Sequence, residues 1–346
     1  MNLERASVRI SQSLSIVVPA YNEEEVLPEF HRRLMAVLSS MSCQAEVVYV
    51  NDGSTDGTLA IVKDLRTQDP RVAIVNLSRN FGKEIALTAG LDHARGDAVV
   101  VIDADLQDPP ELIPRLVEAW EEGADVAYAR RNHREGESWI KKATAFAFYR
   151  VIQRVGRVKI PKDTGDFRLM NRRAVKALGT LREQHRFMKG LFAWVGFRQK
   201  AVPYDRDRRF AGETKWNYWR LWNFALEGVT SFTTAPLKVA TYLGAFVAFW
   251  AFVYAFWVIY KTLVFGEPIR GYPSLMVVIL FLGGVQLIAL GLIGEYVGRM
   301  FDEAKQRPLY ILESYERSAL VVSSEDASCD HDRALVEGKE SSSVSG

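Results

Sequence analysis

Three clusters of acidic and polar residues each follow directly after a short apolar run. They are Pro19-Ala20-Tyr21-Asn22-Glu23-Glu24, Asn51-Asp52-Gly53-Ser54-Thr55-Asp56 and Asp103-Ala104-Asp105-Leu106-Gln107-Asp108. Crowded carboxylates repel one another and are partly desolvated, so their proximity needs compensation. A divalent cation that bridges the carboxylates to a bound diphosphate would supply the compensating positive charge. Mg²⁺ and Mn²⁺ bind one or two carboxylates together with substrate phosphates in this way. The spacing of Asp103 and Asp105 predicts that both ligate one metal ion.

Each cluster alone has a simpler interpretation. An Asp-x-Asp pair is frequent in solvated turns, and Asp52-Gly53 is an ordinary turn signal. Asp56 is typical of a helix N-cap. Glu24 and Glu25 fit the first turn of a helix, where carboxylates stabilise the helix dipole. The occurrence of all three clusters together favours a shared metal and phosphate site.

Alternating strands and helices in residues 14–130 must position these clusters. We expect helices at about 23–41, from Thr55 or Asp56 to about 66, at 83–94 and after Pro109 and Pro110. Continuous apolar strands between helices predict a parallel sheet covered on both faces, which is a doubly wound α/β domain. Ligands bind at the carboxyl ends of such strands, where the acidic clusters lie. The expected strands are 14–18, 46–50, 72–76, 98–102 and 125–129.

Two long segments near the C-terminus carry no charge. Val239–Tyr260 has 22 residues and Gly271–Gly294 has 24, and at about 1.5 Å per residue each can cross a hydrocarbon core of about 30 Å. The short loop between them predicts a transmembrane hairpin with both ends on one side. Met1–Ser13 lacks the apolar core of a signal peptide, so we expect cytoplasmic termini. The two cysteines cannot form a disulfide framework, which fits a reducing compartment.

Basic and aromatic residues mix in two segments, 139–158 and 216–232. Both could be core helices, but this composition is typical of the headgroup boundary of a bilayer. Between Arg130 and Lys162, ten Lys and Arg accompany only two acidic residues. This local charge indicates an anionic surface or ligand as partner, and we expect no nucleic-acid partner.

The chain therefore divides into five expected regions. The regions are a tail at 1–12, a catalytic domain at 13–215 that includes the amphipathic segment 139–158, an interfacial aromatic helix at 216–234, two transmembrane helices at about 237–262 and 272–297 within 235–300, and a cytoplasmic segment at 301–346 that is disordered after about 318.

Glycines on the second span would allow close helix packing, so we also expect a homo-oligomer. They are Gly283, Gly284, Gly291, Gly294 and Gly298.

Four segments, SIVVPAYNEEEVL, VVYVNDGSTDGT, NFGKEIALTAGLDHARGD and VVVIDADLQDPPELI, together resemble inverting family 2 glycosyltransferases with a GT-A fold. They are most similar to the branch that transfers a sugar to a polyprenyl phosphate, as bactoprenol glucosyltransferases and dolichyl-phosphate mannosyltransferases do. The likeness extends from about Ser13 to Pro308. It implies a nucleotide-sugar donor, a polyprenyl-phosphate acceptor, a membrane location and Mg²⁺ or Mn²⁺ as cofactor.

The resemblance also implies residue roles. Asp103 and Asp105 match the metal-binding Asp-x-Asp motif, with Ala104 along the diphosphate and Gln107 after it. Pro19, Tyr21, Glu23 and Asp52 match positions that hold the nucleotide base and ribose. Arg209 and Lys215, at the ends of the segment 209–215, match phosphate-binding positions. Asp166 lies in residues 164–170, which match a loop near the acceptor, and is implied to be a base or an orienting carboxylate.

The chemistry of a lipid phosphate acceptor refines these roles. Its second pKa is near 6, so it is largely dianionic at pH 7 and needs no strong general base. Asp166 is therefore expected to orient rather than to accept a proton. Arg130, Arg131 and Arg168 are the expected ligands of the acceptor phosphate, although Arg130 and Arg131 could also belong to a solvated basic loop.

The predicted function is the transfer of one sugar, with UDP-glucose favoured as donor, to undecaprenyl phosphate in the bacterial inner membrane. The reaction would invert the anomeric centre and give a β-linked donor for cell-envelope glycan or lipopolysaccharide modification. GDP-mannose and other nucleotide sugars remain open. A processive polysaccharide synthase would carry Gln-x-x-Arg-Trp, which Gln184-His185-Arg186-Phe187 matches only superficially. The intact Asp-x-Asp motif argues against a non-catalytic membrane scaffold.

Overall fold

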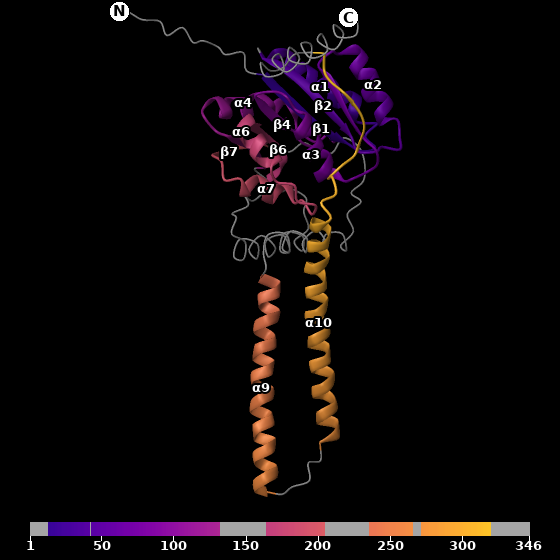
Figure 1. Cartoon of the computed structure of the whole chain (residues 1–346). Helices are drawn as coiled ribbons and strands as arrows, with labels where there is room; N and C mark the ends of the chain where they lie inside the picture. The colour runs from indigo at the N-terminus through magenta and orange to yellow at the C-terminus, as the bar shows by residue number, and fades with distance from the viewer. Residues whose placement is uncertain (1–12, 42, 132–163, 205–234, 266–270, 320–346) are drawn as a thin grey trace, which may run out of the picture.

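A computed structural model describes residues 13–41, 43–131, 164–204, 235–265 and 271–319. The strands of the described residues form one eight-stranded sheet at the centre of the domain, in the order β7-β5-β6-β4-β1-β2-β3-β8 (Figure 1). The strands are β1 (Ser13–Ala20), β2 (Gln44–Asn51), β3 (Val72–Leu77), β4 (Ala98–Val101), β5 (Val126–Arg131), β6 (Thr164–Asn171), β7 (Gln199–Tyr204) and β8 (Leu312–Glu316).

Helices cover both faces of this sheet because successive strand side chains point to opposite faces. Ile16 and Val18 of β1 pack on one face with the apolar sides of α1, α2 and α4, whereas Val17 packs on the other with α3, α6 and α7. The predicted doubly wound α/β architecture is confirmed. The helices are α1 (Leu27–Ser40), α2 (Thr58–Gln68), α3 (Lys83–His93), α4 (Ile113–Glu121, after a 3-10 turn at Pro110–Leu112), α6 (Arg172–Gly179) and α7 (Met188–Trp194).

The sheet is mixed rather than wholly parallel. β1 to β4, β5 and β7 run in one direction, whereas β6 runs antiparallel between β4 and β5, and β8 runs antiparallel to β3. Residues 164–170, which the resemblance assigned to a loop, lie in β6, so that assignment was wrong. Phe167 and Leu169 fill the core on one face of β6, and its backbone pairs with two neighbours. This pairing brings the start of β6 to the carboxyl ends of β4 and β5.

The loop after β1 also differs from the expectation. Helix α1 begins at Leu27, not near Glu23, and Glu24 does not lie in its first turn. Instead, Glu24 Oε2 accepts a hydrogen bond from Gly57 N–H at 2.7 Å. Gly57 is the N-cap of α2, so the expected caps were displaced by one or two residues. Asp56 still contributes, because its Oδ1 accepts from Thr58 N–H at 3.0 Å.

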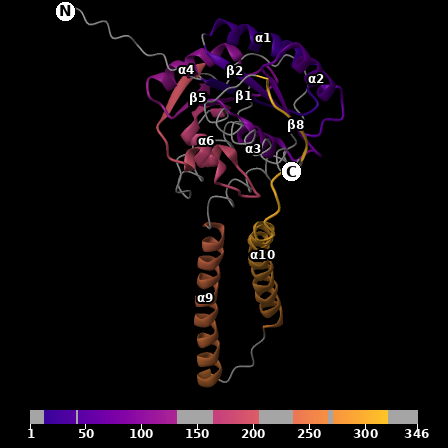
Figure 2. The same ribbon diagram turned by 45° about the horizontal axis from the view of Figure 1, so that its top comes forward.

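Two long helices, α9 (Ala235–Phe265) and α10 (Tyr272–Ala304), run side by side away from the sheet (Figures 1 and 2). By length and composition, Ala240–Lys261 and Phe281–Ala304 could each cross a membrane. The start of α9 and the end of α10 both face the domain, and the chain then returns to the sheet as β8, a strand that the sequence did not predict. The segments expected at 139–158 and 216–234 lie outside the described residues.

Candidate active site

The three acidic clusters lie at one edge of the sheet because β4, β1 and β2 are neighbours and parallel. Their carboxyl ends surround a cavity of about 310 Å³. Every described residue that was predicted to bind the nucleotide sugar lines this cavity except Gln107, and the predicted Arg209 and Lys215 lie outside the described residues. The cavity is lined by Pro19, Ala20, Tyr21, Glu23, Asp52, Asn80, Gly82, Lys83, Ala86, Asp103, Ala104 and Asp105.

Tyr21 and Asp52 form part of this cavity in different ways. The Tyr21 side chain is 45% exposed, so its ring is available to a ligand. Asp52 is buried, and its two oxygens accept hydrogen bonds from Phe81 N–H at 2.7 Å and Gly82 N–H at 2.9 Å. Burial raises the pKa of Asp52 despite these bonds. Asp52 therefore ties the end of β2 to the start of α3, in addition to the role implied by the resemblance.

Asp103 and Asp105 are held in different environments within the loop after β4. Asp103 Oδ2 pairs with the ammonium of Lys83 at 2.7 Å. Asp105 Oδ1 accepts a hydrogen bond from Gln107 N–H at 3.1 Å, in a turn where Leu106 has φ 57°. Gln107 itself is buried. The loop thus presents two carboxylates to the same cavity.

These two carboxylates fit a divalent cation that is shared with a substrate. Among the described residues, no group of three or more His, Cys, Asp or Glu side chains could hold a metal ion. Any cation here would need oxygens from a diphosphate and from water to complete its coordination. Mg²⁺ is commonly bound in that way, through one or two carboxylates plus substrate phosphates.

Lys83 is the main site residue that the sequence reasoning missed. Its Nζ lies 2.7 Å from Asp103 Oδ2 and 2.8 Å from Asp166 Oδ2, so it bridges the end of β4 and the start of β6. Although desolvation opposes its charge, the charges of Asp103 and Asp166 raise the pKa of Lys83. The segment NFGKEIALTAG contains Lys83 and belongs to the resemblance, but a lysine at a helix start carries no distinctive local signal.

Lys83 affects its two partners unequally. Burial dominates at Asp103 and raises its pKa. Burial would also raise the pKa of Asp166, but the charges of Lys83 and then Lys189 outweigh it and lower that pKa strongly. Asp166 is therefore ionised at neutral pH. Its Oδ1 is buried and has no hydrogen-bond partner among the described residues.

The three arginines expected to bind the acceptor phosphate are placed differently. Arg168 is only 5% exposed, and it donates to the carbonyl oxygens of Gly165 at 2.8 Å and Asp166 at 3.2 Å. It also lies over the Phe192 ring at 3.6 Å. Its guanidinium is turned inward in this arrangement, so the geometry does not support Arg168 as a ligand of the acceptor phosphate, and that role stays a prediction.

Arg130 and Arg131 lie at the end of β5. Arg130 is exposed. Arg131 Nε donates to the hydroxyl of Tyr204 at 3.4 Å, and that hydroxyl donates to Asp108. Burial opposes the charge of Arg131, but Tyr204, Asp108 and Asp105 together raise its pKa. Arg131 is thus fixed as a cation beside the loop that carries the Asp-x-Asp motif.

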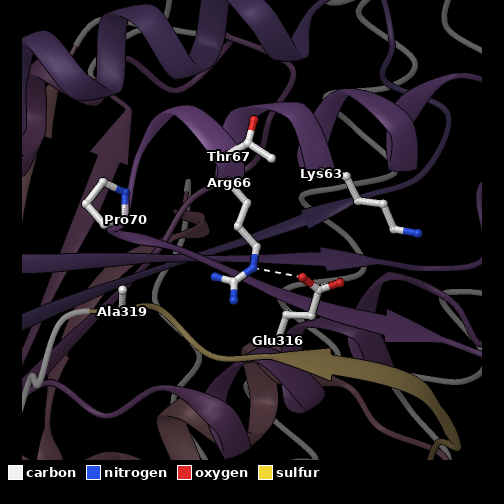
Figure 3. A pocket seen from close by; sticks show the side chains of 6 residues that line it. All are labelled: Lys63, Arg66, Thr67, Pro70, Glu316 and Ala319. Carbon is white, nitrogen blue, oxygen red and sulfur yellow. Dashed lines mark hydrogen bonds and ion pairs between the residues drawn. The ribbon is translucent and has the colours of Figure 1, made fainter.

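A second cavity, of about 580 Å³, lies between α2 and β8 and contains none of the predicted site residues (Figure 3). Arg66 Nε pairs there with Glu316 at 2.8 Å. The same guanidinium donates to the carbonyl oxygens of Val72 and Arg317. Arg66 therefore attaches the C-terminal strand to α2 and β3, which is a structural task.

Comparison with known proteins gives two family matches. A model described as Glycosyl transferase family 2 matches residues 15–179, and a model described as GtrB C-terminal hairpin matches residues 235–300. The second match covers α9 and most of α10.

Several relatives match over most of their length. The SfII prophage-derived bactoprenol glucosyl transferase of Shigella flexneri is 50% identical over 304 residues, which are 88% of this chain and 98% of that protein. The prophage bactoprenol glucosyl transferase homolog of Escherichia coli K12 is 48% identical over 88% of this chain and 99% of that protein. An uncharacterized glycosyltransferase of Synechocystis is 57% identical over 86% of this chain and 94% of that protein.

Proposed function

Because this chain belongs to glycosyl transferase family 2 and has a GT-A fold, we propose that it transfers one sugar from a nucleotide sugar to undecaprenyl phosphate. UDP-glucose is the proposed donor. Identity of 50% to a bactoprenol glucosyl transferase, extending through the C-terminal hairpin, supports this donor and acceptor. The observation that carries the proposal is the pair Asp103 and Asp105 at one cavity, with Asp166 joined to Asp103 through Lys83, in a chain that continues into two membrane-length helices.

The nucleotide sugar would bind in the cavity at the carboxyl ends of β1, β2 and β4. Pro19, Tyr21, Glu23 and Asp52 would hold the base and ribose. The diphosphate would lie along Ala104 and Asp105, with Gln107, Arg209 and Lys215 as further proposed ligands. Mg²⁺ or Mn²⁺ held by Asp103 and Asp105 would neutralise the charge that develops on the leaving diphosphate.

The acceptor phosphate would attack the anomeric carbon from the face opposite the diphosphate. A new C–O bond forms to the phosphate oxygen while the bond to the nucleoside diphosphate breaks and its electron pair leaves with the diphosphate. This single displacement inverts the anomeric centre and gives a β-linked product. Arg130 and Arg131 would hold the acceptor phosphate.

Asp166 would orient the reactants rather than accept a proton. The acceptor is already deprotonated at neutral pH, and a carboxylate with a strongly lowered pKa is a weak base. Productive alignment of two bound reactants can itself supply a large part of the rate enhancement.

We also propose that the protein is a multi-pass protein of the bacterial inner membrane. α9 starts and α10 ends on the side of the catalytic domain (Figure 1), which supports cytoplasmic placement of the domain and both termini. The region boundaries expected from the sequence are retained as part of this proposal. The glycines of the second span would allow another helix to pack closely against α10, which is the basis for proposing a homo-oligomer.

The decisive experiment uses membranes that contain the full-length protein. They are incubated with Mn²⁺, undecaprenyl phosphate and labelled UDP-glucose, and label is counted in the lipid phase. Parallel reactions use GDP-mannose and a UDP-N-acetylhexosamine, and membranes with Asp105→Asn serve as the matched control. One sugar per lipid from UDP-glucose is expected. No lipid label with any donor would overturn the proposal, and longer oligomers would indicate a processive synthase.

A further inference from the structure

Lys83 stands between two carboxylates, one from the loop after β4 and one from β6. Its ammonium pairs with Asp103 Oδ2 at 2.7 Å and Asp166 Oδ2 at 2.8 Å. An ammonium group has three donors, so these two contacts leave one donor. The Lys83 side chain also lines the cavity, with 45% of its surface exposed.

Asp166 has the complementary feature. Its side chain is 9% exposed, and its Oδ1 is buried with no hydrogen-bond partner among the described residues. A buried polar atom without a partner costs free energy, and a carboxylate oxygen can be satisfied only by a donor. Oδ2 of the same carboxylate is bonded to Lys83, which lines the cavity. Asp166 itself lies behind Lys83 and is not among the lining residues, and its Oδ1 is the acceptor of this pair that has no partner among the described residues.

A spare donor and a spare acceptor on two paired side chains match the hydrogen-bonding pattern of a sugar. Each sugar hydroxyl both donates and accepts, so neighbouring hydroxyls can accept from an ammonium and donate to a carboxylate. A diphosphate offers only acceptors and could not satisfy Asp166 Oδ1. The pair therefore suits the sugar of the donor rather than its phosphates.

We propose that Lys83 and Asp166 together bind hydroxyl groups of the donor's sugar and thereby select that sugar. Lys83 donates to one hydroxyl oxygen, and Asp166 Oδ1 accepts from a neighbouring hydroxyl. Because Lys83 also pairs with Asp103, the sugar-binding pair is connected to the carboxylates proposed for the metal. This inference rests on the proposed function, since it requires a nucleotide-sugar donor in this cavity.

The inference is tested by comparing the affinities for UDP and UDP-glucose in full-length, detergent-solubilised protein with Mn²⁺. Lys83→Met removes the charge and keeps the chain length, and Lys63→Met is the control, because Lys63 is exposed on α2 beside the other cavity. A hydrogen bond to a charged group corresponds to about tenfold or more in affinity. Lys83→Met should weaken UDP-glucose about tenfold or more and leave UDP within about twofold. Lys63→Met should change neither affinity.

Two outcomes would overturn the inference. Equal weakening of UDP and UDP-glucose would assign Lys83 to the diphosphate or to the fold, and unchanged affinity for both would mean that Lys83 does not contact the donor. If wild-type protein binds UDP but prefers another nucleotide sugar, that sugar replaces UDP-glucose in the comparison. If wild-type protein binds no nucleotide sugar, the proposed function itself fails, which is a different result.

A double-mutant cycle addresses the shared role of the pair. If Lys83 and Asp166 bind adjacent hydroxyls as one unit, Lys83→Met and Asp166→Asn should be strongly non-additive for UDP-glucose affinity. Donor analogues that each lack one ring hydroxyl are then compared with UDP-glucose. For one of these hydroxyls, removal should weaken binding to the wild-type protein but should not weaken binding to Lys83→Met. Lys83→Arg, which keeps the charge, covers the case in which Lys83→Met does not fold; it should retain more UDP-glucose affinity than Asp166→Asn. Additive effects, with equal sensitivity to every analogue, would contradict the inference.

Discussion

Asp103 and Asp166 contact the same ammonium but respond to it differently. At Asp103 burial is the larger influence and raises the pKa, whereas at Asp166 the charge of Lys83 is reinforced by Lys189 and lowers it. Two carboxylates that contact one ammonium therefore differ in how readily they hold a proton. Asp103 shares the cavity with Asp105, and Asp166 remains an anion whose buried Oδ1 has no hydrogen-bond partner among the described residues.

At the scale of single residues, we expect Asp105→Asn to reduce the rate of sugar transfer by orders of magnitude and to change the thermal unfolding temperature little. Asp105 lies in the cavity-lining loop, outside the two apolar clusters, so its charge serves the ligand more than the fold. Turnover and thermal unfolding are measured on the same preparation. A large fall in unfolding temperature with unchanged turnover would contradict a role in metal binding.

Glu84 predicts a pH dependence of stability. Its pKa is raised from 4.5 to about 7, chiefly by burial and then by the charge of Asp166. Between these two values the folded protein holds a proton that the unfolded chain has released. The free energy of unfolding should therefore fall as the pH rises from about 4.5 to about 7.

The variant Glu84→Gln isolates this contribution. It keeps an acceptor for Met188 N–H, which donates to Glu84 Oε2 at 3.1 Å, but cannot titrate. Its unfolding temperature, followed across this pH range in detergent, should depend less steeply on pH than that of the wild type. Identical pH profiles for both proteins would show that Glu84 is not the group responsible.

At the scale of elements, the start of α3 determines where Lys83 lies. Gly82 is the N-cap of this helix with φ +95°, a conformation that residues with a Cβ rarely adopt. Its N–H donates to Asp52, so the turn is fixed on both sides. The direction of the Lys83 side chain thus depends on a backbone geometry that favours glycine.

Gly82→Ala should lower the free energy of unfolding by about 1–3 kcal/mol, which is the usual cost of holding a residue with a Cβ at a positive φ and extended ψ that only glycine readily adopts. Among the described residues, no atom outside the two chain neighbours lies within 4 Å of the added methyl group, so the cost comes from the backbone conformation. It should also slow sugar transfer by displacing Lys83. Gly179→Ala is the control, because Gly179 ends α6 without a positive φ and with open space. Equal stability of both variants would refute the argument.

At the scale of the whole molecule, α10 is attached to the catalytic domain through its last turn. Glu303 Oε1 accepts from Gln184 N–H at 2.7 Å, and Asp302 Oδ2 lies 3.0 Å from His185 Nε2. The chain that follows forms β8, and Ser318 hydrogen-bonds the buried Glu46 at 3.1 Å. The domain is therefore bound to the hairpin by contacts as well as by chain connectivity.

Replacing Asp302 and Glu303 together by Ala should release the Gln184 amide and the His185 ring from α10. Hydrogen exchange of the Gln184 amide should become faster, since the carboxylate that accepts from it is removed. Glu29→Ala is the control, because Glu29 pairs with Arg32 on the exposed side of α1 and such surface pairs contribute little. Unchanged exchange at Gln184 would mean that the contact does not persist in solution.

The sequence alone indicated the elements and the kind of chemistry, because both depend on local patterns. Continuous apolar runs such as 98–102 predicted buried strands between helices, and the absence of charge predicted two membrane-length helices. The predicted clusters after three of the strands meet at one cavity because neighbouring parallel strands end at the same edge of a sheet.

Tertiary structure decided what depends on strand order and burial. Antiparallel pairing of β6 between β4 and β5 brings Asp166 beside Asp103 and turns Arg168 inward. Lys83, Asp103 and Asp166 lie on α3, after β4 and in β6, so their meeting has no local sequence signal. Side-chain periodicity is set by each segment's own backbone, whereas the partner of a buried charge is set by which distant strands pair.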